Sequence, residues 1–347
     1  MTSITKKILV TGGAGFVGYN IARMLSEEAG NHIFIMDDLS GAAMDEDFRA
    51  LIGKDNVTFY NLDMTDPASY EKIEPRYDHV YHLAGVDGAW RAADSPDLTV
   101  RVNALSTIYL LEFIRKAGNR PRLLFSSSSE NYAGSLRHCS VTVPTPENVP
   151  LCIDDIADPG QAYAASKVMG EIACYHYARQ CGFGCVIVRY HDLYGPRMGP
   201  QHVIPELVGQ MRSGAGRLDV YGVHERRSFC YVTDAARMTI RLMSKEKAIG
   251  RAFNIGCDEE PVRVADVVRM LSVITGIVPE VVPHRALADR AVPQMPDMTA
   301  AQELGAYVSE VPFHVGLLNT YRWFDRQGTL KDALAPVMAA ASIAHVR

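Results

Sequence analysis

The sequence predicts an α/β fold built on a doubly wound parallel sheet, followed by a smaller, mixed C-terminal part. Short runs that are nearly all apolar alternate with helix-compatible stretches, which is typical of parallel strands covered by helices on both faces. A glycine-rich segment directly follows the first run, and an acidic residue ends the second. After about residue 190 the chain changes to loops rich in glycine and proline and to shorter elements.

The apolar runs predict six successive strands and a later one near 252–256. We expect residues 1–189 to form a dinucleotide-binding domain, to which segments near 230–256 return. We expect 190–330 to form the substrate-facing part and 331–347 a terminal helix or frayed tail. The six expected strands are 8–11, 33–36, 57–60, 79–82, 122–126 and 185–189.

Composition excludes several classes of protein. The chain has 347 residues, of which 48% are hydrophobic and 22% charged, so it is long enough for a large globular core. Its net charge of −5 and the lack of a basic stripe disfavour a nucleic-acid partner. No apolar run approaches the length of a membrane span, so we expect no membrane partner.

The seven cysteines indicate a reducing compartment. Their odd number, in a chain with a polar start and no apparent leader, predicts free thiols and a cytoplasmic location. Cys181 and Cys185 are four residues apart, but no second Cys or His pair completes a zinc site, so we predict no metal.

The first turn predicts a phosphate-binding loop of the Rossmann type. Gly12, Gly15 and Gly18 separate the first strand from a helix-compatible stretch at 19–28. Glycines allow the tight bend, the close approach of a pyrophosphate and the close packing of helix on strand. The helix N-terminus would supply N–H groups and a positive dipole to the phosphates.

Asp37 ends the second strand, nineteen residues after Gly18. A carboxylate there can accept both ribose hydroxyls of the cofactor and would repel a 2′-phosphate. The sequence therefore favours NAD over NADP.

Tyr163 and Lys167 lie four residues apart, on one face of a predicted helix. An ammonium group near a phenol favours the phenolate, so Tyr163 can act as a general base on an alcohol while hydride passes to NAD. The stretch 108–114 is apolar almost all round, which indicates a second helix layer and a homodimer. Its four-helix interface would use 103–116 and 163–179 of each subunit.

These motifs, in this order, resemble the extended short-chain dehydrogenase/reductase family, in particular its nucleotide-sugar epimerases, dehydratases and decarboxylases. The resemblance covers nearly the whole chain, from the glycine turn through Leu62-Asp63, His82-Leu83-Ala84-Gly85 and 189–196 to Asn254-Ile255-Gly256. It implies a nucleotide-diphospho-sugar substrate for the part at 190–330. For the cofactor it implies contacts from Gly12, Gly15, Phe16, Val17, Gly18, Asp37, Asp63 (at adenine), Leu83, Ala84, Asn103, Tyr163 and Lys167.

The resemblance also implies the catalytic and substrate-binding residues. Ser128 takes the place of the catalytic Ser or Thr, beside Tyr163 and Lys167, and Glu130 could take a proton from sugar C5 of a 4-keto intermediate. Arg227 is expected to bind the diphosphate. The full set expected at the substrate is Ser128, Ser129, Asp192, Val203, Tyr221, Arg227 and Arg290.

Departures from the family's patterns bear on the reaction. Glu130 resembles the decarboxylases and some dehydratases, but Gln294 stands where the decarboxylases have an Arg, and only Arg285 or Arg290 could replace it. Ser129 replaces an Asp that many dehydratases use. Asp192 stands where the family usually has Asn, and a carboxylate there would repel phosphate unless it is protonated or paired.

We therefore expect 4-epimerisation through a 4-keto sugar. The alternatives are a 4,6-dehydratase or uronate decarboxylase that uses Glu130 and, in a different class, a dinucleotide-binding sensor or scaffold without turnover. An intact set of Ser128, Tyr163 and Lys167 argues against the sensor, which would need only the glycine turn.

Overall fold

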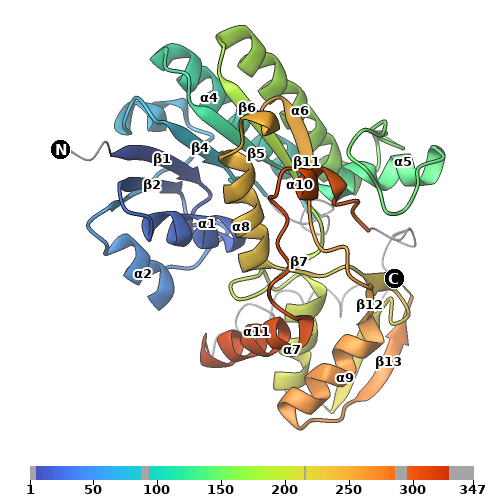
Figure 1. Ribbon diagram of the computed structural model, residues 1–347. Coiled ribbons are helices and arrows are strands. Elements are labelled where there is room, and N and C mark those ends of the chain that lie inside the picture. Colours follow the sequence, from blue (N-terminus) through green and yellow to red (C-terminus); the bar gives the residue numbers. More distant parts are fainter. Residues whose placement is uncertain (1–4, 87–93, 215, 286–294, 328–347) are drawn as a thin grey trace.

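The computed structural model describes residues 5–86, 94–214, 216–285 and 295–327. Arg290, Gln294 and the expected tail at 331–347 lie outside these ranges. Figure 1 shows a central sheet with helices on both faces, and a group of smaller elements beyond one end of the strands.

The central sheet is parallel and has seven strands in the order β11-β6-β5-β4-β1-β2-β3. The chain runs outward from β1 to β3 and then crosses to β4 on the other side of β1. This reversal of order leaves a crevice at the carboxyl ends of β1 and β4, where parallel α/β sheets bind ligands. The strands are β1 (Lys6–Thr11), β2 (Asn31–Asp37), β3 (Val57–Asn61), β4 (His79–His82), β5 (Arg122–Ser128), β6 (Gly184–Tyr190) and β11 (Arg251–Ile255).

The predicted doubly wound sheet is confirmed, and the apolar runs lie within these strands. The last four residues of β1 and five consecutive residues of β6 are buried, because helices cover both faces of the sheet. The return of the chain near 252–256 adds β11 to the sheet edge beside β6.

Two apolar clusters fill the two sides of the sheet. The helices on one side include α1 (Phe16–Ser26), α2 (Glu46–Ile52), α8 (Val232–Met243) and α10 (Thr299–Glu303). On the other side lie the 3-10 helix η1 (Pro67–Lys72), α4 (Pro96–Ala117) and α6 (Gln161–Cys181).

The first helix begins earlier than the sequence predicts. We expected a helix at 19–28, whereas α1 begins at Phe16 and ends at Ser26. Gly18 therefore lies in its first turn, where a Cβ atom would be 2.1 Å from the Gly12 carbonyl oxygen. Glycine at this position lets the helix begin directly against the turn, and residue patterns do not resolve such a boundary.

A third apolar cluster holds together most of the elements after β6. The main helices there are α7 (Val203–Arg212), α9 (Val264–Thr275) and α11 (Phe313–Gln327). The strands pair two by two: β7 (Leu193–Tyr194) with β10 (Cys230–Tyr231), β8 (Arg217–Tyr221) with β13 (Glu280–His284), and β9 (Arg226–Arg227) with β12 (Val262–Arg263). Short helices η2 (Ser129–Tyr132) and α5 (Ala133–His138) follow β5, and η3 (Glu246–Ala248) precedes β11.

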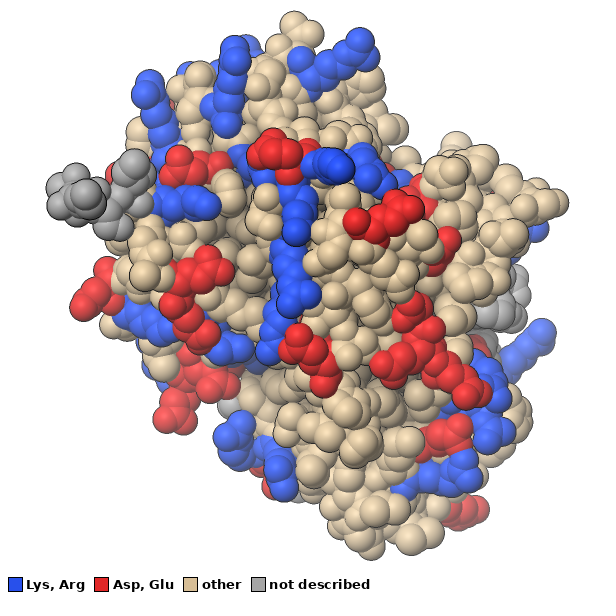
Figure 2. Space-filling view, viewed as in Figure 1, with Lys and Arg blue, Asp and Glu red and all other residues tan. Residues whose placement is uncertain are grey.

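The viewed surface mixes charges of both signs. Figure 2 shows Lys and Arg interspersed with Asp and Glu on this face, with neither sign dominating it. Among the described residues, no helix combines the length and apolar character needed to cross a membrane.

Candidate active site

A cleft of about 1590 Å³ lies between the carboxyl ends of the sheet strands and the elements that follow β6. This volume exceeds that of a site for one drug-sized ligand, which is about 300–1,000 Å³. Its walls include residues from the glycine turn, the ends of β2, β4 and β5, helix α6 and the segments 198–204 and 222–229. The cleft therefore has room for a dinucleotide and a second ligand.

The glycine turn fits a pyrophosphate. Gly12 has φ +68°, and a Cβ atom there would lie 2.6 Å from the backbone nitrogen of Ala84. Helix α1 begins directly after Gly15, and no described side chain caps its first turn. The first N–H groups of α1 are therefore left to hold a ligand, and an anionic one is favoured by the helix dipole.

Asp37 is placed at the end of β2 by two backbone hydrogen bonds. Its Oδ2 accepts from the Ala14 N–H at 3.0 Å and its Oδ1 from the Leu39 N–H at 2.8 Å. Burial raises the pKa of Asp37 above its ordinary value, although both N–H groups oppose this shift. The carboxylate lines the cleft in a fixed orientation, which suits recognition of a ribose.

His82 is a structural residue beneath the glycine turn. Its Nδ1 lies 2.8 Å from Thr11 Oγ1 and its Nε2 lies 3.0 Å from Thr107 Oγ1. Thr107 donates its hydroxyl hydrogen to the Asn103 carbonyl, so His82 carries its proton on Nε2. Burial lowers the pKa of His82 to about 3, and the ring is neutral at pH 7.

Asn103 acts from behind the cleft rather than on its surface. Its Oδ1 accepts from the Val86 N–H at 2.7 Å, and its Nδ2 donates to Ser166 Oγ at 2.9 Å. It thereby ties the loop after β4 to helix α6. Asn103 is not among the described residues that line the cleft.

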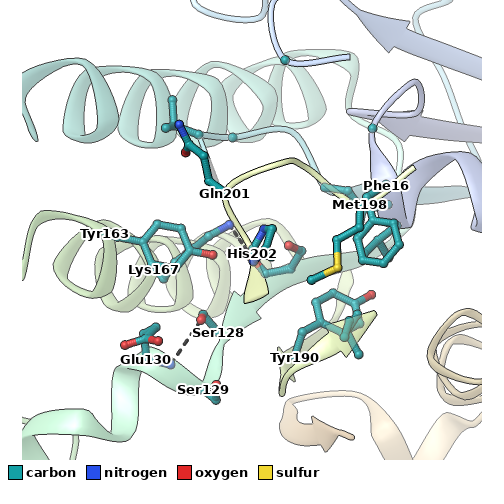
Figure 3. A pocket seen from close by; sticks show the side chains of 18 of the residues that line it. Phe16, Ser128, Ser129, Glu130, Tyr163, Lys167, Tyr190, Met198, Gln201 and His202 are labelled. Atoms are coloured by element: carbon teal, nitrogen blue, oxygen red, sulfur yellow. Dashed lines mark hydrogen bonds between the residues drawn. The ribbon is translucent and has the colours of Figure 1, made fainter. Parts of the chain in front are cut away.

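Tyr163 and Lys167 lie together on α6, and both side chains are largely buried. The Lys167 Nζ donates to the Ser126 carbonyl at 2.9 Å and lies 5.7 Å from the centre of the Tyr163 ring. Figure 3 shows Tyr163, Ser128 and Glu130 around the same hollow. The Ser128 Oγ accepts from the Glu130 N–H at 3.2 Å, so its own hydroxyl hydrogen can be donated to a ligand.

A buried ion pair supports the strand end that carries these residues. Arg189 and Glu171 lie 2.7 Å apart, and both side chains are almost completely buried. Ser127 donates to Glu171 at 2.6 Å, and Arg189 donates to the Tyr132 hydroxyl at 2.8 Å. Burial opposes the charge of Arg189, but Glu171 and Tyr132 hold its pKa above the ordinary value. The pair fixes η2, and with it Glu130.

The far wall of the cleft holds Arg227 between two carboxylates. Its guanidinium lies 3.5 Å from Asp192 Oδ1 and donates to Glu225 Oε2 at 3.0 Å. Burial opposes the charge, but Asp192, Glu225 and then Glu130 raise the pKa of Arg227 above its ordinary value. Asp192 is thus a paired carboxylate, so its charge is compensated by Arg227.

The structure brings most of the expected site residues into the cleft. Tyr221 is not among the described lining residues; its ring stacks on His284, with the ring centres 4.9 Å apart. Asp63 lines the cleft and also accepts from the Thr65 N–H at 2.7 Å. The others that line it are Gly12, Gly15, Phe16, Val17, Gly18, Asp37, Leu83, Ala84, Ser128, Ser129, Glu130, Tyr163, Lys167, Asp192, Val203 and Arg227.

Several lining residues were not expected from the sequence. Glu225 lies two residues before Arg227, and His202 directly precedes Val203, so proximity to a motif was the available signal. Arg101 lies two residues before Asn103 and His284 directly precedes Arg285, so here too the neighbouring candidate was the available signal. No cluster of metal-ligating side chains is found in the part of the chain that the structure describes.

The fold and the cleft together define a dinucleotide-binding protein whose cleft has room for a second ligand. The profile of the "NAD dependent epimerase/dehydratase family" matches residues 8–256. The chain therefore belongs to this family, whose members use NAD, and it is an NAD-dependent enzyme.

Known proteins similar to the chain carry out three different reactions. UDP-glucuronic acid decarboxylase 1 of Xenopus tropicalis is 27% identical over 93% of this chain and 73% of its own. dTDP-glucose 4,6-dehydratase 1 of Escherichia coli is 27% identical over 92% of each chain. The structure of UDP-glucuronic acid 4-epimerase from Bacillus cereus, solved with UDP-glucuronic acid and NAD, has a TM-score of 0.79 and 25% identity, and the similarity covers 92% of this chain and 99% of that chain.

Proposed function

We propose that the protein is a 4-epimerase of a nucleotide-diphospho-sugar and acts through a 4-keto intermediate. One observation carries the proposal: Tyr163, Lys167 and Ser128 line the same cleft as the glycine turn and Asp37. Bound NAD supplies the chemistry that these side chains lack, because its nicotinamide ring accepts a hydride from carbon and returns it.

Tyr163 is the general base of the proposed reaction. Its phenolate removes the proton of the sugar 4-hydroxyl and returns it when the 4-keto group is reduced, so the protein ends each cycle unchanged. Lys167 stabilises the phenolate by its positive charge and is held in place by the Ser126 carbonyl. Ser128 donates a hydrogen bond to the reacting oxygen.

Arg227 and the half of the chain after residue 190 hold the substrate. We propose that residues 190–330 form the nucleotide-sugar-binding part and that Arg227 binds the diphosphate with its planar guanidinium. Asp192, Val203 and Ser129 line the same cleft and are candidates for substrate contacts. Asp37 reads the ribose of NAD and disfavours NADP.

Epimerisation is favoured because it needs no group beyond this set. Ser129 occupies the place of an acid that many dehydratases use, and Gln294 occupies the place of the decarboxylase arginine. The second candidate function, dehydration or decarboxylation, is favoured by Glu130, whose carboxylate belongs to the reactive end of the cleft. There it could take a proton from sugar C5 of the 4-keto intermediate.

Product analysis separates these functions. The protein is incubated with NAD and, in parallel, with UDP-glucose, UDP-glucuronic acid and dTDP-glucose, and the products are analysed by mass spectrometry and NMR. An epimerase changes the configuration at C4 without changing the mass, a dehydratase removes water and a decarboxylase removes carbon dioxide. A sensor or scaffold would bind NAD and leave every sugar unchanged.

We also propose a cytoplasmic homodimer that pairs α4 and α6 of each subunit. Val100 on α4 and Ile172 on α6 are 45% and 55% exposed, which leaves apolar side chains on the two helices in the single chain. A second copy would cover them. Sedimentation velocity at micromolar concentration tests this, and a monomer would contradict it.

A further inference from the structure

Arg197 connects the two sides of the cleft from a position just outside it. It follows β7 and Gly195-Pro196, and it begins the segment whose next residues, Met198 and His202 among them, line the cleft. Its φ is +70°, a left-handed conformation that a residue other than glycine adopts only where its surroundings hold it there.

The contacts of the Arg197 side chain provide that hold. One terminal nitrogen forms an ion pair with Asp45, and the two side chains are only 5% and 7% exposed. The other terminal nitrogen donates to the Ala14 carbonyl at 2.8 Å. The guanidinium also lies 4.4 Å from the centre of the Tyr19 ring on α1.

Each of these contacts is made to the cofactor side of the cleft. Ala14 belongs to the glycine turn, and its N–H group is the one that holds Asp37 Oδ2. Asp45 caps α2 by accepting from the Phe48 N–H at 2.8 Å, and it ends the segment after β2 that supplies Asp38 and Ser40 to the cleft. Arg197 therefore holds together the glycine turn, through Ala14, and the segment after β2 that ends at Asp45.

This connection is specific to the arginine. Its Nε is buried without a hydrogen-bond partner among the described residues, which costs free energy. The ion pair with Asp45 and the hydrogen bond to Ala14 must offset this cost. Lysine at 197 could form the ion pair but could not also donate to Ala14 in the same planar fork.

We propose that Arg197 is a positioning residue that couples the substrate-side segment 198–203 to retention of NAD. A ligand that orders 198–203 holds Arg197 against Ala14 and Asp45 and thereby slows the departure of the dinucleotide. Because coupling between two binding sites is reciprocal, NAD also tightens binding of that ligand. Such retention suits a cycle in which the same cofactor molecule must give back the hydride that it received.

The test measures cofactor binding rather than turnover. Dissociation of NADH is followed by stopped-flow fluorescence, with and without UDP as the substrate-side probe, in the wild type, Arg197→Lys, and the double variant Arg197→Met/Asp45→Asn. The double variant removes both buried charges, and Asn keeps the cap of α2. Arg217→Met, at an exposed ion pair with Asp219, is the control.

In the wild type and the control, we expect UDP to slow NADH release. In both Arg197 variants we expect NADH to leave roughly tenfold to a hundredfold faster, as loss of a charge-assisted contact predicts, and UDP to have no effect on its rate. At saturating NAD the variants should regain most of their kcat. An unchanged release rate, or a UDP effect that persists in folded variants, would overturn the proposal. The proposed sugar chemistry would be untouched by that result, because product analysis tests it separately.

Discussion

The Asp192 carboxylate lies 3.5 Å from the Arg227 guanidinium, which also donates a hydrogen bond to Glu225 at 3.0 Å. One cation in the substrate half of the cleft is thus shared by two carboxylates. If Arg227 binds a diphosphate, that ligand must compete with both of them. On that proposal, Asp192 and Glu225 together weaken the binding of a nucleotide.

Asp192→Asn should bind UDP more tightly than the wild type. The change removes a negative charge beside the proposed phosphate site and keeps a side chain of the same shape. Two unit charges about 4 Å apart interact by about 1 kcal/mol in water, so the gain in affinity should be about fivefold or more. Isothermal titration calorimetry measures it, with Asp266→Asn at a surface ion pair as the control. Weaker UDP binding would show that Asp192 itself holds the substrate.

Tyr163→Phe should lose about 10²–10⁴ in kcat, because it removes only the group that moves the proton. NAD affinity should stay close to that of the wild type, since the ring remains on α6. Tyr177→Phe on the same helix, where the hydroxyl donates to Glu112, should be active. Turnover of Tyr163→Phe near the wild-type rate would reject the assignment.

Asp37 should make the protein prefer NAD. The carboxylate, held by Ala14 and Leu39, would repel a 2′-phosphate, and we expect NADP to bind roughly tenfold more weakly or worse. Asp37→Asn removes the charge and keeps one oxygen, which can accept from only one of the two N–H groups, and it should narrow the difference between NAD and NADP affinity. Fluorescence titration with NADH and NADPH gives both affinities, and equal binding by the wild type would contradict this reading.

Glu130→Gln distinguishes the two catalytic functions. In a 4-epimerase the variant should keep much of its activity, because no C5 proton is removed. In a dehydratase or decarboxylase the product should disappear while NADH still accumulates. Incorporation of deuterium at sugar C5 from heavy water, lost in Glu130→Gln, would establish the second function, and Glu246→Gln at an exposed ion pair is the control.

Stability should fall with acid because of His82. Its pKa is about 3 in the folded protein and about 6.5 in the unfolded chain, so the unfolded state binds more protons between these values. The stabilising contribution is complete above pH 6.5 and is lost as the pH falls toward 3, with a loss of about 2 kcal/mol at pH 5. Urea unfolding at pH 7 and 5 measures this. His82→Gln should reduce the pH dependence but not abolish it, because burial also lowers the pKa of His79 and of His191 to about 4.

The sheet could be predicted because burial of its strands requires short apolar runs, and the turn before the first helix requires glycines at fixed positions. That Gly12, Gly18 and Asp37 line the cleft was predictable for the same reason, since they stand at fixed spacings along one βαβ unit. The start of α1 at Phe16 was missed, because a glycine inside a first helical turn looks like part of a loop.

The far wall was less predictable because its contacts join distant parts of the chain. The ion pair of Arg197 with Asp45 spans 152 residues, and no pattern around either residue indicates it. The pairing of Asp192 with Arg227 likewise depends on how β7 meets β10. Tyr221 fits a family motif, yet its ring faces His284.

The buried pair of Arg189 and Glu171 limits which positions of this protein can change without loss of folding. Loss of either charge would leave the other buried and unpaired. Ser127, Asn131 and Tyr132 form hydrogen bonds to the same pair. Substitutions at these positions should therefore impair folding. Most residues of the segments 198–203 and 222–224 are partly exposed and carry no comparable penalty. Directed evolution toward a new sugar should therefore yield folded variants mainly from libraries in those two segments, with the reactive wall inherited unchanged.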